Sequence, residues 1–84
     1  MAINEFFVTS RVDRWYVDNG VDSHGPYFSQ HDAVADAIQA AEQIASKKKA
    51  TAVLLKLPGS NATMIWNSRQ AMRDAESAKL NEGV

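Results

Sequence analysis

The chain has 84 residues, of which 45% are hydrophobic, and its formal net charge is −1 at pH 7. This length predicts one domain with a thin core, and the hydrophobic fraction excludes a disordered chain. The absence of cysteine excludes disulfides, cysteine–zinc sites and thiol nucleophiles.

Targeting signals and charge distribution give two further expectations. The first residues, MAINEFF, contain no basic segment and no long apolar run, so we predict neither a signal peptide nor a membrane span and expect a cytoplasmic protein. Arg11 and Arg14 are the only basic residues before Lys47, whereas basic residues outnumber acidic ones from Lys47 onward. This asymmetry predicts a basic patch or a head-to-tail attraction between subunits, and the alternative is a uniformly solvated charged surface.

The first quarter of the chain predicts two strands. Ile3–Val12 is rich in β-branched and aromatic residues, and Trp15–Asp18 alternates along its length. Asp13–Arg14 can supply the tight turn between them. Val21–Tyr27 contains a Gly-Pro pair and predicts a loop, with a short extended piece at Tyr27–Phe28.

A long amphipathic helix is predicted over Ser29–Lys49. Ser29 is a favourable N-cap, and Asp32 stands at the capping-box position. Phe28 precedes the cap and is placed to act as a hydrophobic staple, while Lys47–Lys49 complement the helix dipole at the other end. The apolar stripe recurs every three or four residues, at Val34, Ala37, Ile38, Ala41, Ile44 and Ala45.

The last part of the chain predicts a hairpin and a second helix. Thr51–Leu57 and Thr63–Asn67 are β-prone, and the segment Pro58–Asn61 between them is a strong turn. Ser68–Leu80 can form a shorter helix with Asn67 or Ser68 as its cap, followed by a frayed end.

These elements predict an α+β fold. We expect a four-stranded antiparallel sheet (strand-strand-helix-strand-strand), with the long helix on one face and a shorter C-terminal helix. Residues 1–67 would form the domain, and residues 68–84 the C-terminal helix and tail. Strand alternation sends one set of side chains toward the helix, namely Trp15, Val17, Val53, Leu55 and Ile65. It sends another set to the opposite face, namely Tyr16, Leu54, Met64 and Trp66.

A resemblance to a known family rests on three short segments. They are FFV, the Trp-X-Val strand at Trp15–Val17, and Phe28-Ser29 before an Ala-rich helix. The chain from Phe6 to Trp66 resembles domain-of-unknown-function family 2188, a small bacterial family. It departs from that family at Arg14, where Gly is usual, and at Ser29, where Thr is usual. The resemblance implies the strand-strand-helix-strand-strand plan and carries no activity or functional residues.

Catalytic and metal-binding patterns are missing from the sequence. His24 and His31 match no zinc spacing, no serine stands in a nucleophile-elbow context, and Gly59 belongs to a Pro-Gly turn. We therefore predict a non-enzyme without metal or cofactor.

The apolar sheet face leads to the functional hypothesis. We expect a non-catalytic interaction or accessory module that associates with itself through Tyr16, Leu54, Met64 and Trp66, because aromatic residues and Met are enriched at interface cores. The chain's own C-terminal helix could instead cover this face. The alternative function is single-stranded nucleic-acid binding, with the aromatics stacking on bases and phosphates contacting Lys47, Lys48, Lys49 and Lys56. A different protein is also a possible partner of such an interaction module. An enzyme site or a small-ligand pocket at a subunit interface is a third alternative, and no sequence motif supports it.

Overall fold

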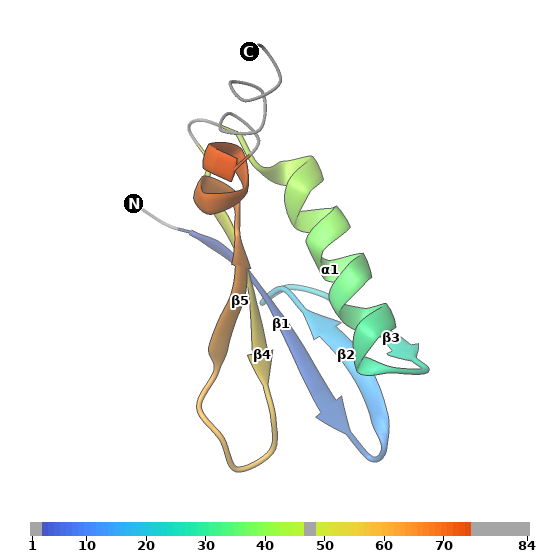
Figure 1. Cartoon of the computed structure of the whole chain (residues 1–84). Coiled ribbons are helices and arrows are strands. Elements are labelled where there is room, and N and C mark those ends of the chain that lie inside the picture. The colour runs from blue at the N-terminus through green and yellow to red at the C-terminus, as the bar shows by residue number, and fades with distance from the viewer. Residues whose placement is uncertain (1–2, 47–48, 75–84) are drawn as a thin grey trace.

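The computed structural model describes residues 3–46 and 49–74 (Figure 1). One long helix lies against one face of a single sheet, and a second helix begins at residue 68. The elements are β1 (Asn4–Arg11), β2 (Arg14–Asp18), β3 (Ser23–Tyr27), α1 (Gln30–Ile44), β4 (Thr51–Lys56) and β5 (Thr63–Asn67).

The sheet has five strands in the order β3-β2-β1-β4-β5. Its central pair, β1 and β4, is parallel, and every other neighbouring pair is antiparallel. The predicted α+β class with a long helix and a short C-terminal helix is confirmed, but the four-stranded antiparallel sheet is wrong. The missed strand is β3. Because each element, α1 included, reverses the chain direction, one extra strand before α1 makes β4 run parallel to β1.

Strand β3 forms despite its sequence, SHGPY. Pro26 has no amide donor, which an edge strand tolerates. The β2–β3 register shifts between Trp15 and Val17, and Gly25 at this bulge has a φ of +134°. A Cβ at Gly25 would lie 2.9 Å from Cδ1 of Tyr16, so only glycine allows the strand to approach so closely. Pairing with β2 therefore makes Ser23–Tyr27 a strand, although its local sequence is typical of a loop.

Helix α1 begins as predicted and covers the core with its smallest side chains. The Oγ of Ser29 accepts the Asp32 amide at 3.1 Å. Alanines at every fourth position are buried and let the helix approach the sheet closely, and these are Ala33, Ala37 and Ala41. They pack against buried side chains of the sheet, namely Phe6, Val8, Val17 and Val53. Phe28 is 96% exposed, so the predicted hydrophobic staple is wrong.

The C-terminal end of α1 is fixed by a buried polar contact. The helix ends at Ile44, before the predicted end at Lys49. The hydroxyl of Thr51 donates to the Ala41 carbonyl at 3.0 Å, and the Thr51 amide donates to the Ser68 hydroxyl at 2.9 Å. Thr51 and Ser68 are both buried. These two bonds join the end of α1, the start of β4 and the start of the C-terminal helix.

Two local boundaries complete the fold. The turn between β1 and β2 lies at Val12 and Asp13, which both have positive φ, and not at Asp13–Arg14 as predicted. The C-terminal helix is capped by Asn67, whose Oδ1 accepts the Gln70 amide at 2.8 Å. Its predicted continuation from residue 75 to Leu80 lies outside the described residues.

Candidate functional site

The candidate site lies on the face of the sheet that α1 does not cover, called the open face below. Registers place its side chains: Phe7 pairs with Leu54, and Leu54 pairs with Met64. Thr9 pairs with Tyr16 in the same face. Tyr16, Leu54 and Met64 therefore share the open face, as the alternation predicted.

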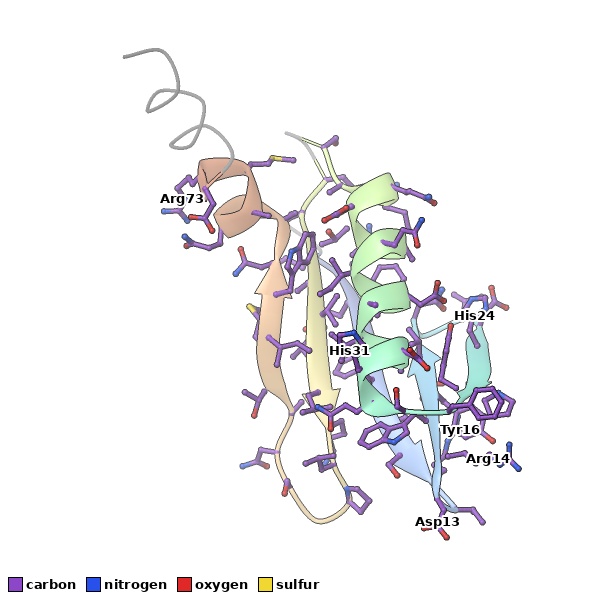
Figure 2. The ribbon with its side chains drawn as sticks, turned by 45° about the vertical axis from the view of Figure 1, so that its right-hand side comes forward. Asp13, Arg14, Tyr16, His24, His31 and Arg73 are labelled. Carbon is purple, nitrogen blue, oxygen red and sulfur yellow. The ribbon has the colours of Figure 1, made fainter. Side chains whose placement is uncertain are left out.

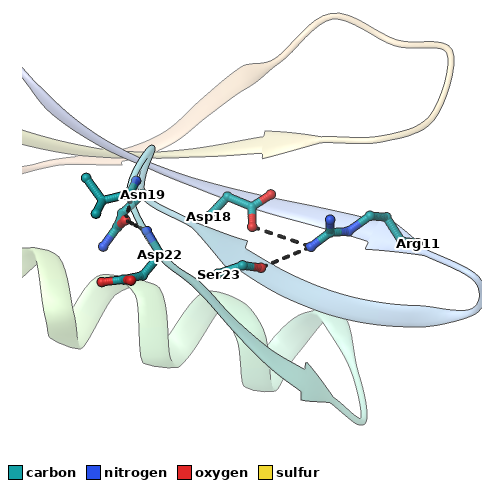
Figure 3. Close-up of polar contacts among 6 residues, drawn as sticks. Arg11, Asp18, Asn19, Asp22 and Ser23 are labelled. Carbon is teal, nitrogen blue, oxygen red and sulfur yellow. Dashed lines mark hydrogen bonds and ion pairs between the residues drawn. The ribbon is translucent and has the colours of Figure 1, made fainter.

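The part of the open face over β2 and β3 is covered by its own polar side chains (Figure 3). The guanidinium carbon of Arg11 lies 4.4 Å from the centroid of the Tyr16 ring. Its Nη2 donates to Ser23 Oγ at 3.0 Å and pairs with Asp18 Oδ1 at 3.4 Å. We call these four residues the Arg11 network. Arg11 occupies one side of the Tyr16 ring and leaves less of the ring available to a partner.

The part over β1, β4 and β5 carries four apolar side chains, although Glu5, Thr9 and Lys56 alternate to the same face. Met64 is 50% exposed and Ile3 is 49% exposed, while Phe7 and Leu54 are half-buried. Ile3 and Met64 border a hollow of about 100 Å³ next to Ala52. Ile3, Phe7, Leu54 and Met64 form the surface that we call the apolar patch. No polar network comparable to that of Arg11 spans these four side chains among the described residues.

Trp66 does not lie on the open face, which corrects the prediction. It pairs with Val53, whose side chain is fully buried, and it packs against the helix-side core. The register shifts between Val53 and Leu54, so one additional residue, Ile65, stands between the paired positions of β5. A bulge changes the face of every residue beyond it, and a strict period of two cannot anticipate this. Ile65 is exposed and is not among the core residues, unlike the prediction.

The two edges of the sheet have different chemistry. β3 carries Pro26 and Gly25, both of which weaken pairing with a further strand. β5 has the sequence TMIWN, with no charge, proline or glycine, and in the described part of the chain it pairs with β4 alone. The edge position follows from the sheet order. In the sequence, the only sign that Thr63–Asn67 could pair with a further strand is its uncharged, β-prone composition.

The predicted lysine cluster is not assembled by the described residues. Lys49 precedes β4 and Lys56 ends it, so a strand of about 17 Å separates them. The Lys56 ammonium donates to the Ser60 carbonyl. Lys47 and Lys48 lie outside the described residues.

Residues 3–46 and 49–74 contain no group of three or more His, Asp or Glu side chains able to hold a metal ion. Figure 2 shows His24 on β3 and His31 on α1, well apart from each other. Within these ranges, no helix has the length and apolar character needed to cross a membrane.

Comparisons with known proteins add no assignment. No protein-family model, no curated protein and no solved structure matches this chain. The resemblance to domain-of-unknown-function family 2188 therefore stays a prediction.

Proposed function

We propose that the protein is a non-catalytic interaction module that forms a homodimer through the apolar patch. The observation that carries this proposal is the contrast within the open face among the described residues. The half over β1, β4 and β5 exposes apolar side chains beside Glu5 and Lys56, whereas the Arg11 network covers the half over β2 and β3. Contiguous exposed apolar surface bordered by polar groups is typical of association sites.

A second copy is the partner that fits this surface best. Two copies related by a two-fold axis would place patch against patch, which is how most small homo-oligomers associate. Phe7 and Leu54 would lie at the centre, with Met64 and Ile3 around them, and Met adapts well to an irregular apolar surface. Glu5 lies between Ile3 and Phe7 along the chain and would lie at the edge of the contact, and Lys56 and the Arg11 network would complete the polar rim.

The size of the patch sets the expected strength. Stable complexes bury about 800 Å² on each partner, and four side chains supply less than that. We therefore expect a reversible dimer whose population rises with protein concentration and is insensitive to salt, because apolar contacts are not screened.

Molar mass measured by light scattering after size-exclusion chromatography tests the proposal, over a range of concentrations and at two salt levels. Met64→Lys should give a monomer at concentrations where the parent chain is dimeric, because the substitution introduces a charge into the contact. Val21→Lys is the matched control, since Val21 is 90% exposed in the β2–β3 connection and the charge change is identical. A parent chain that is monomeric throughout, or dimers that survive Met64→Lys, would contradict the proposal.

Single-stranded nucleic-acid binding is the competing proposal and has less support. Tyr16 and Lys56 do share the open face with Arg14, which favours contact with a phosphate backbone. However, Arg11 covers one side of the Tyr16 ring, and Lys49 and Lys56 lie at opposite ends of β4. Fluorescence anisotropy with a labelled oligonucleotide tests it, because phosphate contacts weaken steeply as salt is raised.

A further inference from the structure

A second hollow lies on the opposite side of the sheet, between α1 and strands β2 and β3. Its volume is about 250 Å³. Asp36, Ala40 and Ile44 recur every fourth residue and form the stripe of α1 that borders it. The register pairs Val17 with His24, which places His24 on the side of the sheet that faces α1.

The walls of the hollow are apolar inside and polar at the mouth. Phe6 and Val17 are buried and form the floor, and the small side chain of Ala40 leaves the space open. Asn19, His24 and Tyr27 are the polar residues on the strand side. This combination of an apolar interior and a few polar groups is typical of small-ligand sites, although the volume is below that of drug-sized sites.

The defining polar feature is a pair formed by Tyr27 and Asp36. The Tyr27 hydroxyl donates to Oδ2 of Asp36. Burial of the hydroxyl, followed by this bond and by the carboxylate charge, raises the pKa of Tyr27 to about 12. The tyrosine therefore stays a neutral donor at physiological pH. Asp36 is exposed, and its Oδ1 accepts no hydrogen bond among the described residues, so this oxygen is open to a ligand from solvent.

No positive side chain neutralises this carboxylate within the described residues. Neither Lys nor Arg lines the hollow, and the ion pair of the described chain, Arg11–Asp18, belongs to the open face. A carboxylate beside an aromatic ring and an apolar hollow is complementary to a positive group on an apolar stem.

We infer that the hollow binds a small organic cation, a short alkylammonium or alkylguanidinium. The cationic head lies at Oδ1 of Asp36 beside the Tyr27 ring, and the alkyl stem lies on Val17, Ala40 and Ile44. This site is independent of the proposed dimer, because the sheet separates it from the apolar patch.

An NMR titration of the ¹⁵N-labelled full chain with butylammonium and with butylguanidinium tests the inference. The amide signals of His24, Tyr27 and residues near Asp36 should shift and saturate. Butanol and butyrate are the controls, because they keep the stem and replace the cation by a neutral or a negative group. Saturable shifts of the same amides with butanol at equal concentration, or no shifts with either cation, would overturn the inference.

Two substitutions separate the charge from the shape of the site. Asp36→Asn should weaken binding about tenfold, the effect expected for losing a charge-assisted contact. Tyr27→Phe keeps the ring and the carboxylate and should bind within a few-fold of the parent. Glu42→Gln is the matched control for net charge, since Glu42 is an exposed acid of the same helix that does not line this hollow. Unchanged affinity in Asp36→Asn, or an equal loss in Glu42→Gln, would overturn the assignment of Asp36.

Discussion

The two faces of the sheet are built from the same strands and bury their side chains by different means. On the covered face, Val53 is fully buried beneath the alanine stripe of α1. On the open face its neighbour Leu54 is only half-buried, and the half of that face over β2 is covered by the Arg11 network. A helix, a polar network and, we propose, a second copy are three ways of covering one sheet. The functional surface is therefore expected on the part of the sheet that neither α1 nor the Arg11 network covers.

The largest expected effect comes from truncating neighbours that point to opposite faces. Val53→Ala should lower the free energy of unfolding by about 2–3 kcal/mol, because it leaves a cavity under α1. Leu54→Ala should cost roughly 1 kcal/mol in the monomer, although more atoms are removed, because the side chain is already in contact with water. Urea denaturation of both variants at low protein concentration measures the difference. Equal losses would mean that the open face is as well covered as the other.

Gly25→Ala tests how closely β3 is held against Tyr16. The added methyl would meet Cδ1 of Tyr16 and the Trp15 carbonyl oxygen at 2.9 Å, and φ at Gly25 is +134°. We expect a loss of about 1–2 kcal/mol in unfolding free energy. Gly20→Ala is the control, because Gly20 also has a positive φ but a Cβ there meets nothing within 4 Å. A loss no larger than that of the control would show that β3 can move away from β2.

Val12→Asn should stabilise the protein. Val12 has a φ of +49°, which a β-branched side chain adopts at a cost of about 1 kcal/mol, and it is almost fully exposed. Asparagine tolerates this conformation, so the midpoint of thermal unfolding should rise. The same substitution at Val21, which is also exposed and has no positive φ, is expected to leave the midpoint unchanged.

Tyr27 on the α1 side predicts a dependence of stability on pH. Its pKa is raised from 10.0 to about 12, so the folded state holds the hydroxyl proton more tightly than the unfolded chain. The contribution is fully present below pH 10 and is lost as the pH rises toward 12. Urea denaturation between pH 9 and pH 12 should show a steeper loss for the parent than for Tyr27→Phe. If the unfolding free energies of the parent and of Tyr27→Phe fall equally with pH, the Tyr27 hydroxyl does not cause the pH dependence.

The smallest effect is expected from the Arg11 network. Arg11→Met should cost less than about 1 kcal/mol, because both members of the Arg11–Asp18 pair are partly exposed. Its more useful readout is the Tyr16 ring, from which the guanidinium is removed. If the dimer contact shifts onto this ring in Arg11→Met, adding Tyr16→Lys to that variant will lower its molar mass in solution. Tyr16→Lys alone is not expected to change the molar mass of the parent chain.

The sequence was most informative where the decisive forces are local. The Ser29 cap, the start of α1 and the β5 boundaries depend on neighbouring residues and are confirmed. Tyr16, Leu54 and Met64 share one face as predicted, because none of the three lies beyond the Ile65 bulge that moved Trp66 to the other face. The end of α1 was placed too late, since it is set by contacts of Thr51, which is distant from Ala41 in the sequence.

By itself, the amino-acid sequence determined the α+β class, the amphipathic helix, four of the strands and the presence of an apolar face. The tertiary structure decided the rest. Pairing with β2 made Ser23–Tyr27 a strand and thereby turned the β1–β4 pair parallel. The bulge at Ile65 moved Trp66 to the core. Both outcomes depend on hydrogen bonds between strands, and these bonds form only after distant segments meet, so no local pattern records them.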